Sequence, residues 1–376
     1  MVKLAIIHFN PIELYPPVMN WVNFLGEQEY PVEVKVFSMK VPGIPKSFQS
    51  KKPFIDILRS GNQKSKSIIL RYWSYFLFYA KTTFTLLWWR PDTLMYYETY
   101  SSLPAVLYHK LAGRRPRLFI HYHEYTSPED YLKQGKFYRL LHKLERIIYP
   151  VSQWLSHTNQ ERMQLFLKDN QDILIPHPFI LPNYPPRSWK PRKVLPVHTT
   201  PLKIVYIGAL SLETMYVKEF IDWVLQQKGE VIFDIYSSNC TEDAKAYLQS
   251  MESDLVHLYE GVDYFSLPEI LAKYDIGVIL YKGHLQNYIY NAPNKLFEYL
   301  ACGLDVWFPD ILVTTRNYVT TDSYPKVISI RFSELDQFRW QNAVERDHLD
   351  YKPSVFYCDG VFDSLWRKIM PQTGLS

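Results

Sequence analysis

The sequence predicts an α/β protein made of two doubly wound parallel-sheet domains that face each other across a cleft. Short apolar runs of strand length alternate with longer amphipathic segments of helix length, and this alternation occurs in two separate series. A proline-rich stretch at 177–201 with little periodicity separates the two series. At 376 residues, the chain is long for one core and comfortable for two. We therefore expect ligands to bind at the carboxyl ends of the strands, in the cleft.

The first series predicts a domain at 1–176. We expect its strands at 4–8, 32–37, 94–97, 117–121 and 154–158, with 173–175 closing this half. We expect its helices at 17–28, 68–89, 102–112, 130–149 and 160–168. A polar loop that runs through Lys64 is expected between the second strand and the 68–89 helix.

The second series predicts a domain at 202–355, joined to the first by the 177–201 linker. We expect its strands at 202–207, 231–236, 256–259, 276–280, 306–308 and 326–330. We expect its helices at 214–227, 242–251, 267–274 and within 291–303. A final amphipathic helix at 361–370 belongs to a C-terminal segment, 356–376, which we expect to pack back on the first domain.

The composition indicates a globular protein and argues against some functional classes. The chain is 47% hydrophobic and 21% charged, an ordinary globular balance, and its formal net charge of +4 is too mild for a dedicated nucleic-acid binder. The three cysteines are far apart and have no metal or redox spacing, which favours a reducing cytoplasm. The first apolar run is too short for a signal peptide and is expected to be a buried strand.

The segment 68–89 raises the question of a membrane. It is rich in Tyr, Phe, Leu and Trp, but Arg71 and Lys81 interrupt it, so it does not fit a spanning helix. One interpretation is a core-facing helix with an aromatic stripe. The other is an interfacial helix that touches the membrane through its aromatic side chains and keeps its Arg and Lys at the headgroups.

The segment 291–303 has the features of a helix that begins at a ligand. Asn291 can cap the helix, Pro293 suits its first turn, and Gly303 can end it in a left-handed conformation. The first turn combines free backbone N–H groups, a positive dipole end and Lys295, which suit a phosphate. Glu298 follows one turn later and can accept hydrogen bonds from sugar hydroxyls. Phosphate and ribose together indicate a nucleotide.

The order of motifs resembles the GT-B fold glycosyltransferases, and most closely the large retaining family 4. The segment 293–303, preceded by the apolar strand 275–280, resembles the donor-binding segment of that family. The segment 202–208 resembles the strand and glycine that open its second, Rossmann-like domain. The passages 257–261 and 267–275 follow in the family's order, and 120–124 resembles a first-domain strand end that carries a His followed by an acid.

The resemblance implies transfer of a sugar from a nucleotide-diphosphate donor to a glycan or lipid-linked acceptor, with retention of the anomeric configuration. It implies catalysis without a cofactor or metal ion, in the cytoplasm, for example in bacterial surface polysaccharide assembly. The candidate catalytic residues are His123 and Glu124. The candidate donor-binding residues are Gly208, Lys218, Tyr290, Asn291, Asn294, Lys295 and Glu298. The candidate acceptor or sugar contacts are Asn10, Glu98, His284 and Asn287.

Several of these residues have a second interpretation. His121 and His123 lie on one face of a strand, so His123 is either a site residue or a satisfied buried histidine, and with Glu124 the pair is a weak metal candidate. Glu98 is an acceptor-side carboxylate or a plain loop charge. The loop 283–290 either contacts the donor sugar or is a variable surface loop.

Two other functions stay open. Many family members carry a first glutamate eight residues before the position of Glu298, where this chain has Tyr290. This departure favours a non-catalytic glycosyltransferase-like partner subunit as one alternative. The other is a sugar-nucleotide epimerase on the same fold, which would need no acceptor.

Overall fold

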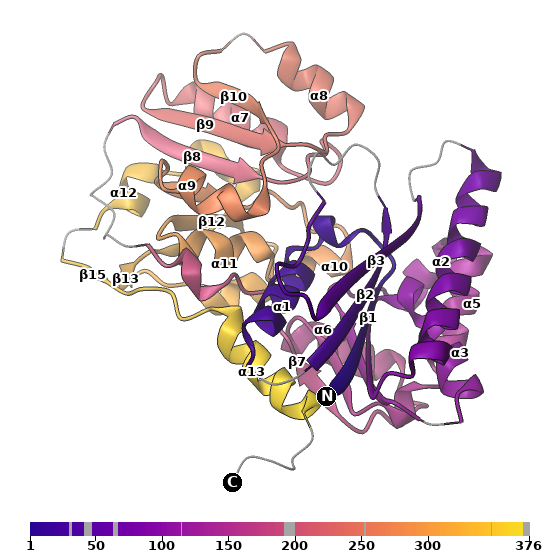
Figure 1. Cartoon of the computed structure of the whole chain (residues 1–376). Helices are drawn as coiled ribbons and strands as arrows, with labels where there is room; N and C mark the ends of the chain where they lie inside the picture. The colour runs from indigo at the N-terminus through magenta and orange to yellow at the C-terminus, as the bar shows by residue number, and fades with distance from the viewer. Residues whose placement is uncertain are drawn as a thin grey trace. The chain divides into compact units, whose positions relative to one another are not determined.

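The computed structural model describes residues 1–29, 32–40, 47–62, 67–113, 115–191, 200–251, 253–346 and 348–370. The chain divides into two compact units (Figure 1). The first unit consists of Met1–Pro182 together with Cys358–Ser376, and the second consists of Asn183–Tyr357. Each unit is an α/β layer structure in its own right and is described by itself.

The first unit is built on a parallel sheet of seven strands, in the order β3-β2-β1-β4-β5-β6-β7. Strands β1 and β4, at the centre, are almost wholly buried, as expected for a parallel sheet covered on both faces. The strands are β1 Val2–His8, β2 Val32–Lys40, β3 Ile55–Asn62, β4 Thr93–Tyr97, β5 Arg117–Tyr122, β6 Trp154–His157 and β7 Pro178–Ile180.

Helices cover both faces of this sheet. Side chains of α2, α3 and α6 share one hydrophobic core with Ala5 and Ile7 of β1, and α1 packs on α13, where the rings of Trp21 and Phe362 lie 5.1 Å apart. The helices are α1 Pro16–Glu27, α2 Ile68–Trp89, α3 Ser102–Leu111, α4 Pro128–Lys133, α5 Lys136–Glu145, α6 Gln160–Asp169 and α13 Cys358–Ile369.

The second unit is built on a parallel sheet of six strands, in the order β10-β9-β8-β11-β12-β14. A separate parallel pair, β13 Ser323–Tyr324 with β15 Asp350–Tyr351, lies outside it. The six strands are β8 Leu202–Ile207, β9 Val231–Ser237, β10 Val256–Glu260, β11 Ile276–Val278, β12 Asp305–Pro309 and β14 Val327–Ile330.

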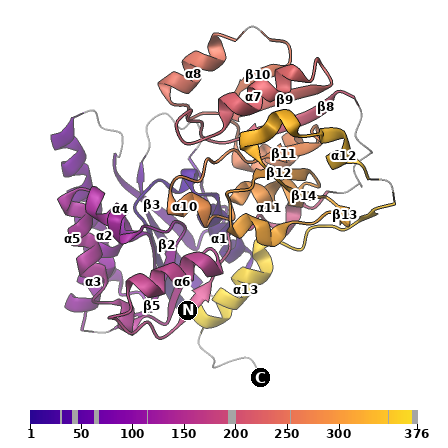
Figure 2. The same ribbon diagram turned by 180° about the vertical axis from the view of Figure 1, so that it is seen from behind.

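The helices of the second unit form two layers as well. The helices α7 and α8 belong to one hydrophobic core, whereas α9 and α11 belong to the core on the other face of the sheet. Figure 2 shows α7, α8 and α11 from behind. The helices are α7 Val217–Gln226, α8 Glu242–Gln249, α9 Leu267–Leu271, α10 Gln286–Ile289, α11 Asn294–Ala301 and α12 Trp340–Val344. The predicted class, two doubly wound parallel-sheet domains, is therefore confirmed.

Three local predictions were wrong. The expected polar loop before α2 contains strand β3, whose polar residues are tolerated because an edge strand has only one neighbour. The expected helix at 130–149 is two helices, because Gln134 and Gly135 take extended conformations between α4 and α5. The expected element at 173–175 is not a strand, and the last strand, β7, lies within the predicted linker 177–201, of which 192–199 is outside the described residues.

Candidate functional site

Polar side chains gather at the carboxyl end of the first unit's sheet. They come from the ends of β1, β4, β5 and β6, where the parallel topology brings consecutive strand ends together. His8 ends β1, Glu98 follows β4, His121 lies near the end of β5 with His123 just after that strand, and Ser156 lies in β6. Two of these, Glu98 and His123, are residues that the sequence predicted.

A hydrogen-bonded pair of histidines occupies the centre of this cluster. His121 Nδ1 lies 2.9 Å from Ser156 Oγ, and His121 Nε2 lies 3.2 Å from His123 Nδ1. Burial, with a further contribution from His157, lowers the pKa of His121 to about 3, so its ring is neutral at physiological pH. One ring must then donate and the other accept in the bond between them, which links the tautomer of His123 to that of His121.

Glu98 connects β4 to the segment after β5. Its backbone has φ 62° and ψ 157°, a region that residues other than glycine rarely adopt. Its Oε1 accepts from the backbone N–H of His123 at 2.6 Å and from that of Glu124 at 3.3 Å. Burial, followed by the Glu124 carboxylate, raises the pKa of Glu98 to about 8. The strained conformation therefore holds a titratable carboxyl group against the predicted catalytic residues.

The carbonyl side of the same turn is fixed by α6. Arg162 is buried and donates from Nη1 to His123 O at 2.7 Å and to Thr158 Oγ1 at 3.0 Å. The His123 backbone is thus held by Glu98 on its N–H and by Arg162 on its carbonyl. The Glu124 side chain itself is exposed. These bonds fix the backbone of the turn from both sides.

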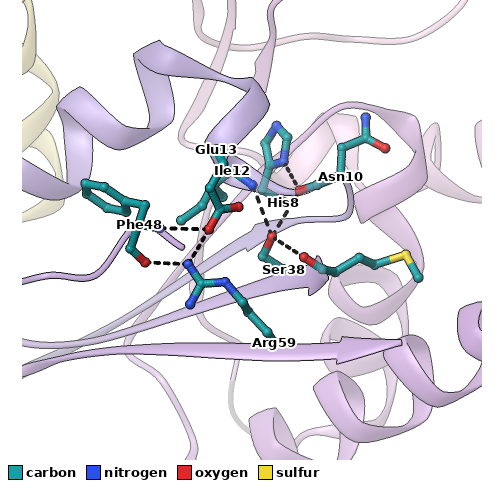
Figure 3. Close-up of polar contacts among 8 residues, drawn as sticks. His8, Asn10, Ile12, Glu13, Ser38, Phe48 and Arg59 are labelled. Carbon is teal, nitrogen blue, oxygen red and sulfur yellow. Dashed lines mark hydrogen bonds and ion pairs between the residues drawn. The ribbon is translucent and has the colours of Figure 1, made fainter. Parts of the chain in front are cut away.

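The loop after β1 is braced in a different way, which Figure 3 shows. Ser38 Oγ donates to Asn10 O at 3.1 Å and accepts from Ile12 N at 3.2 Å. Glu13 accepts from Arg59 Nη2 at 2.5 Å and from Phe48 N at 3.0 Å. The Asn10 side chain, a predicted contact residue, donates from Nδ2 to Tyr15 Oη at 2.8 Å.

Three aromatic residues of this cluster were missed by the sequence reasoning. His8 is buried, and its ring centroid lies 4.3 Å from that of Tyr15 and 6.3 Å from that of His123. Tyr97 stacks on His123 with centroids 5.2 Å apart. Burial lowers the pKa of His8 to about 4, so it too is neutral. The position of His8 at the end of the first strand was the signal that could have identified it.

The second unit has a cluster at the carboxyl ends of β8 and β11, centred on Lys295. Gly208, just after β8, has φ 142°, and a Cβ built there would lie 2.7 Å from Lys295 Nζ. The ammonium lies over the rings of Tyr206 and Tyr281, at 5.4 and 5.8 Å from their centroids. Glycine therefore suits position 208 for two reasons: the backbone has a positive φ, and the Lys295 ammonium leaves no room for a Cβ atom.

Close packing places α11 at this strand end. Gly277 of β11 lies under Tyr299, since a Cβ there would be 2.1 Å from the tyrosine ring, and Tyr299 Oη accepts from Ile207 N at 3.2 Å. The helix begins at Asn294 with Pro293 as its N-cap residue. Asn291, expected to cap it, does not, because the cap residue is Pro293 and no side chain bonds to the cap. The Leu296 N–H bonds to Pro293 O at 2.9 Å, and the start of the helix as a whole is the end that suits an anion.

Glu298 lies one turn beyond Lys295 on α11 and is buried. Burial raises the pKa of its carboxyl group, Lys295 lowers it, and the result is a pKa of about 7. Gly208, Lys295, Glu298 and the start of α11, with Asn294, are thus brought together by the fold.

Of the other predicted donor or sugar contacts in this unit, Lys218 lies apart, whereas the 283–290 loop adjoins the Lys295 cluster, because Tyr288 stacks on Tyr281 with centroids 4.9 Å apart. The Lys218 ammonium lies over the ring of Tyr247 on α8, 5.0 Å from its centroid, rather than with Lys295. His284 is exposed, 6.1 Å from the ring of Tyr288. Asn287 lies on α10 and Tyr290 follows it, both partly exposed.

The histidines and acids of the chain were a weak metal candidate in the sequence. Within the described ranges, no group of three or more His, Cys, Asp or Glu side chains is arranged to hold a metal ion. The histidine pair at the end of β5 is instead explained by its bonds to Ser156 and to each other.

Comparison with solved structures identifies the fold. No family model and no curated protein matches the sequence. The chain is similar to sucrose-phosphate synthase from Thermosynechococcus elongatus (TM-score 0.67, 11% identity, 98% of this chain and 99% of that one). It is similar to the apo form of the lipopolysaccharide outer core galactosyltransferase WaaB (TM-score 0.61, 15% identity, 98% and 99%). It is also similar to Anabaena HepE in complex with UDP and glucose (TM-score 0.61, 11% identity, 98% and 96%).

One structural neighbour has a different chemistry. A protein from Listeria monocytogenes, provisionally assigned as a UDP-N-acetylglucosamine 2-epimerase, matches with a TM-score of 0.55 at 10% identity, over 100% of this chain and 99% of that one. At these identities the likeness defines the fold and not the activity. The two parallel-sheet units thus have the GT-B fold that the resemblance predicted.

Proposed function

We propose that this protein is a glycosyltransferase that takes a sugar from a nucleotide-diphosphate donor. The observation that carries the proposal is the Lys295 ammonium, which lies against Gly208 at the end of β8, with Glu298 one helical turn away. A fixed cation, the start of a helix and a carboxylate in that order fit a diphosphate followed by a ribose.

In this proposal the second unit binds the donor. Lys295 and the first N–H groups of α11 neutralise the charge that develops on the leaving diphosphate, which they can do without a divalent ion. Ionised Glu298 accepts hydrogen bonds from the ribose hydroxyls. Gly208 lets the backbone approach the phosphates closely.

The first unit, in the same proposal, binds the acceptor and supplies the catalytic residues. His123 and Glu124 lie on a turn fixed by Glu98 and Arg162, as precise catalysis requires. The transfer proceeds with retention of configuration, which the resemblance to family 4 implies.

The proposed acceptor is a glycan or lipid-linked saccharide of cell-surface polysaccharide or glycoconjugate assembly in the cytoplasm. In support, the structural neighbour WaaB is named for lipopolysaccharide core synthesis. The three cysteines Cys240, Cys302 and Cys358 form no disulfide, which suits a reducing compartment.

The first experiment is a thermal-shift screen against UDP, GDP, ADP and CDP and their sugars. A ligand at 100 times its Kd should raise the stability by about 2.7 kcal/mol. Glu298→Ala should abolish the shift of the binding nucleotide, whereas Glu269→Ala, an exposed glutamate on α9, should keep it. Unchanged nucleotide affinity in Glu298→Ala would contradict the assignment of the site.

The epimerase is a second candidate, because one structural neighbour carries that provisional assignment. Incubating the binding nucleotide sugar without any acceptor separates the two functions. An epimerase interconverts the donor sugar under these conditions, and a transferase does not. Nucleotide binding with no turnover under either condition would identify a non-catalytic subunit.

A further inference from the structure

Helix α2 is two-sided in an unusual way, because both of its faces are apolar. Its inner face, with Phe78, Tyr79, Leu86 and Trp89, is buried in the core of the first unit. The outer face of a surface helix is normally charged or polar. Here most outward positions are instead filled by large apolar side chains, and Lys81 is an exposed charge among them.

These outward residues follow the helical period closely. Ile69, Trp73, Phe76, Phe84 and Trp88 succeed one another at spacings of three, four or eight residues, so they form one stripe along the helix. Ile69 is 76% exposed, Trp73 56% and Trp88 77%. Trp73 and Phe76 stack on each other, with ring centroids 5.3 Å apart. A continuous exposed stripe of this kind marks an interaction surface.

A row of positive charge lies in the same layer. Helix α5 exposes Lys136, Arg139 and Lys143 together with Leu140, and its single acid, Glu145, is fully buried. The two helices lie on the same side of the sheet in Figures 1 and 2, and the rings of Tyr79 and Phe137 are 6.0 Å apart. Helices in one layer present their outer faces in the same general direction, so aromatic and basic side chains share one surface.

We infer that this surface, formed by the outward residues of α2 and α5, binds the headgroup region of an anionic lipid membrane. Tryptophan and phenylalanine insert favourably at the boundary of headgroups and acyl chains, and lysine and arginine pair with anionic lipids. In the part of the chain that the structure describes, no helix is long and apolar enough to cross a membrane, so α2 lies on the surface instead. The inference goes beyond the proposed transfer reaction and does not depend on it.

Charge favours a lipid over a second protein copy as the occupant. The exposed charged side chains of α5 are all positive, and two copies that met through this surface would place like charges against each other. An anionic bilayer instead complements the basic row while it takes up the aromatic stripe.

The test is co-sedimentation of the full-length protein with vesicles of phosphatidylcholine alone or mixed with phosphatidylglycerol. The wild type should bind the anionic vesicles and release them at high salt. The double variant Trp73→Glu/Trp88→Glu should bind at least about tenfold more weakly, because it replaces inserted rings with charges. Lys136→Glu/Arg139→Glu/Lys143→Glu should lose on the order of a hundredfold on anionic vesicles only.

The matched control is Val355→Glu, a substitution at a residue of the second unit that is 79% exposed. It should bind vesicles like the wild type, and all variants should keep the wild-type melting temperature because the substituted side chains are exposed. Failure of the wild type to bind either kind of vesicle would overturn the inference. So would a dimer, seen by light scattering, that the α2 substitutions dissociate. Nucleotide binding is measured in parallel, and its outcome bears only on the proposed function.

Discussion

The two clusters at the strand ends of this protein differ in chemistry although both lie in the same place on a parallel sheet. The first unit gathers neutral histidines and a carboxyl group whose pKa is about 8, held by many mutual hydrogen bonds. The second gathers a lysine, two tyrosine rings, a glycine and the start of a helix. The first arrangement suits the holding and movement of protons, and the second suits the holding of an anion.

This difference indicates which of the two clusters would perform each part of a transfer reaction. Binding energy for a diphosphate comes from fixed positive groups, whereas proton transfer needs groups whose ionisation is finely balanced. The two requirements conflict within one small cluster, since a lysine beside Glu98 would lower the raised pKa of that carboxyl, as Lys295 does for Glu298. Separate strand ends avoid the conflict.

The substitution His123→Ala tests this division of roles most directly. If the first cluster performs chemistry and does not bind the donor, the rate of transfer should fall by about 10²- to 10⁴-fold. Nucleotide affinity, measured by calorimetry, should stay unchanged. His177→Ala, at a histidine outside this cluster, is the control. Lost nucleotide affinity in His123→Ala would show that the division of roles is wrong.

The reciprocal test is Lys295→Ala. Removing the charge that faces the diphosphate should weaken nucleotide binding by about 1.5–3 kcal/mol, which is roughly 10- to 150-fold. Calorimetry measures this, with Lys218→Ala as the matched control because its ammonium lies over Tyr247. Equal losses in both variants would mean that Lys295 has no special role.

The pH dependence of donor binding tests the role of Glu298. Its pKa of about 7 lies above the ordinary value, so the carboxyl is largely protonated at pH 6 and ionised at pH 8. Since only the ionised form accepts from both ribose hydroxyls, affinity for the nucleotide sugar should rise up to about tenfold between these values. Glu298→Gln should bind weakly and with no such dependence. A wild-type affinity that is flat across this range would refute the prediction.

The effect expected for Glu98 is on stability and not on donor binding. Its folded pKa of about 8 exceeds the ordinary value, so the folded state holds a proton that the unfolded state releases, and stability falls as pH rises toward 8. The Tm of Glu98→Gln should therefore fall less than that of the wild type between pH 6 and 9. Linkage gives about 1.36 kcal/mol per pH unit below the folded pKa, or about 2.7 kcal/mol between pH 6 and 8, so we expect a Tm difference of several degrees. If the Tm of the wild type and the Tm of Glu98→Gln fall equally between pH 6 and 9, the prediction is wrong.

Much of the fold followed from local pattern. Helix α2 spans the predicted 68–89, and strand β8 spans the predicted 202–207, because long periodic runs leave little choice of structure. Strand β3 was missed because its residues, Ile55–Asn62, are mixed in polarity and are strand only by pairing with β2.

The sequence by itself determined the two-part α/β architecture and the helix that carries Lys295 and Glu298. These depend on local periodicity and on glycine, both of which act over a few residues. Only the tertiary structure placed His8 and Tyr97 beside His123, put Glu98 against the following strand and turned Lys218 away from Lys295. Those contacts join residues from different strands or helices, and their geometry depends on strand order and packing. A single sequence does not specify either of these locally.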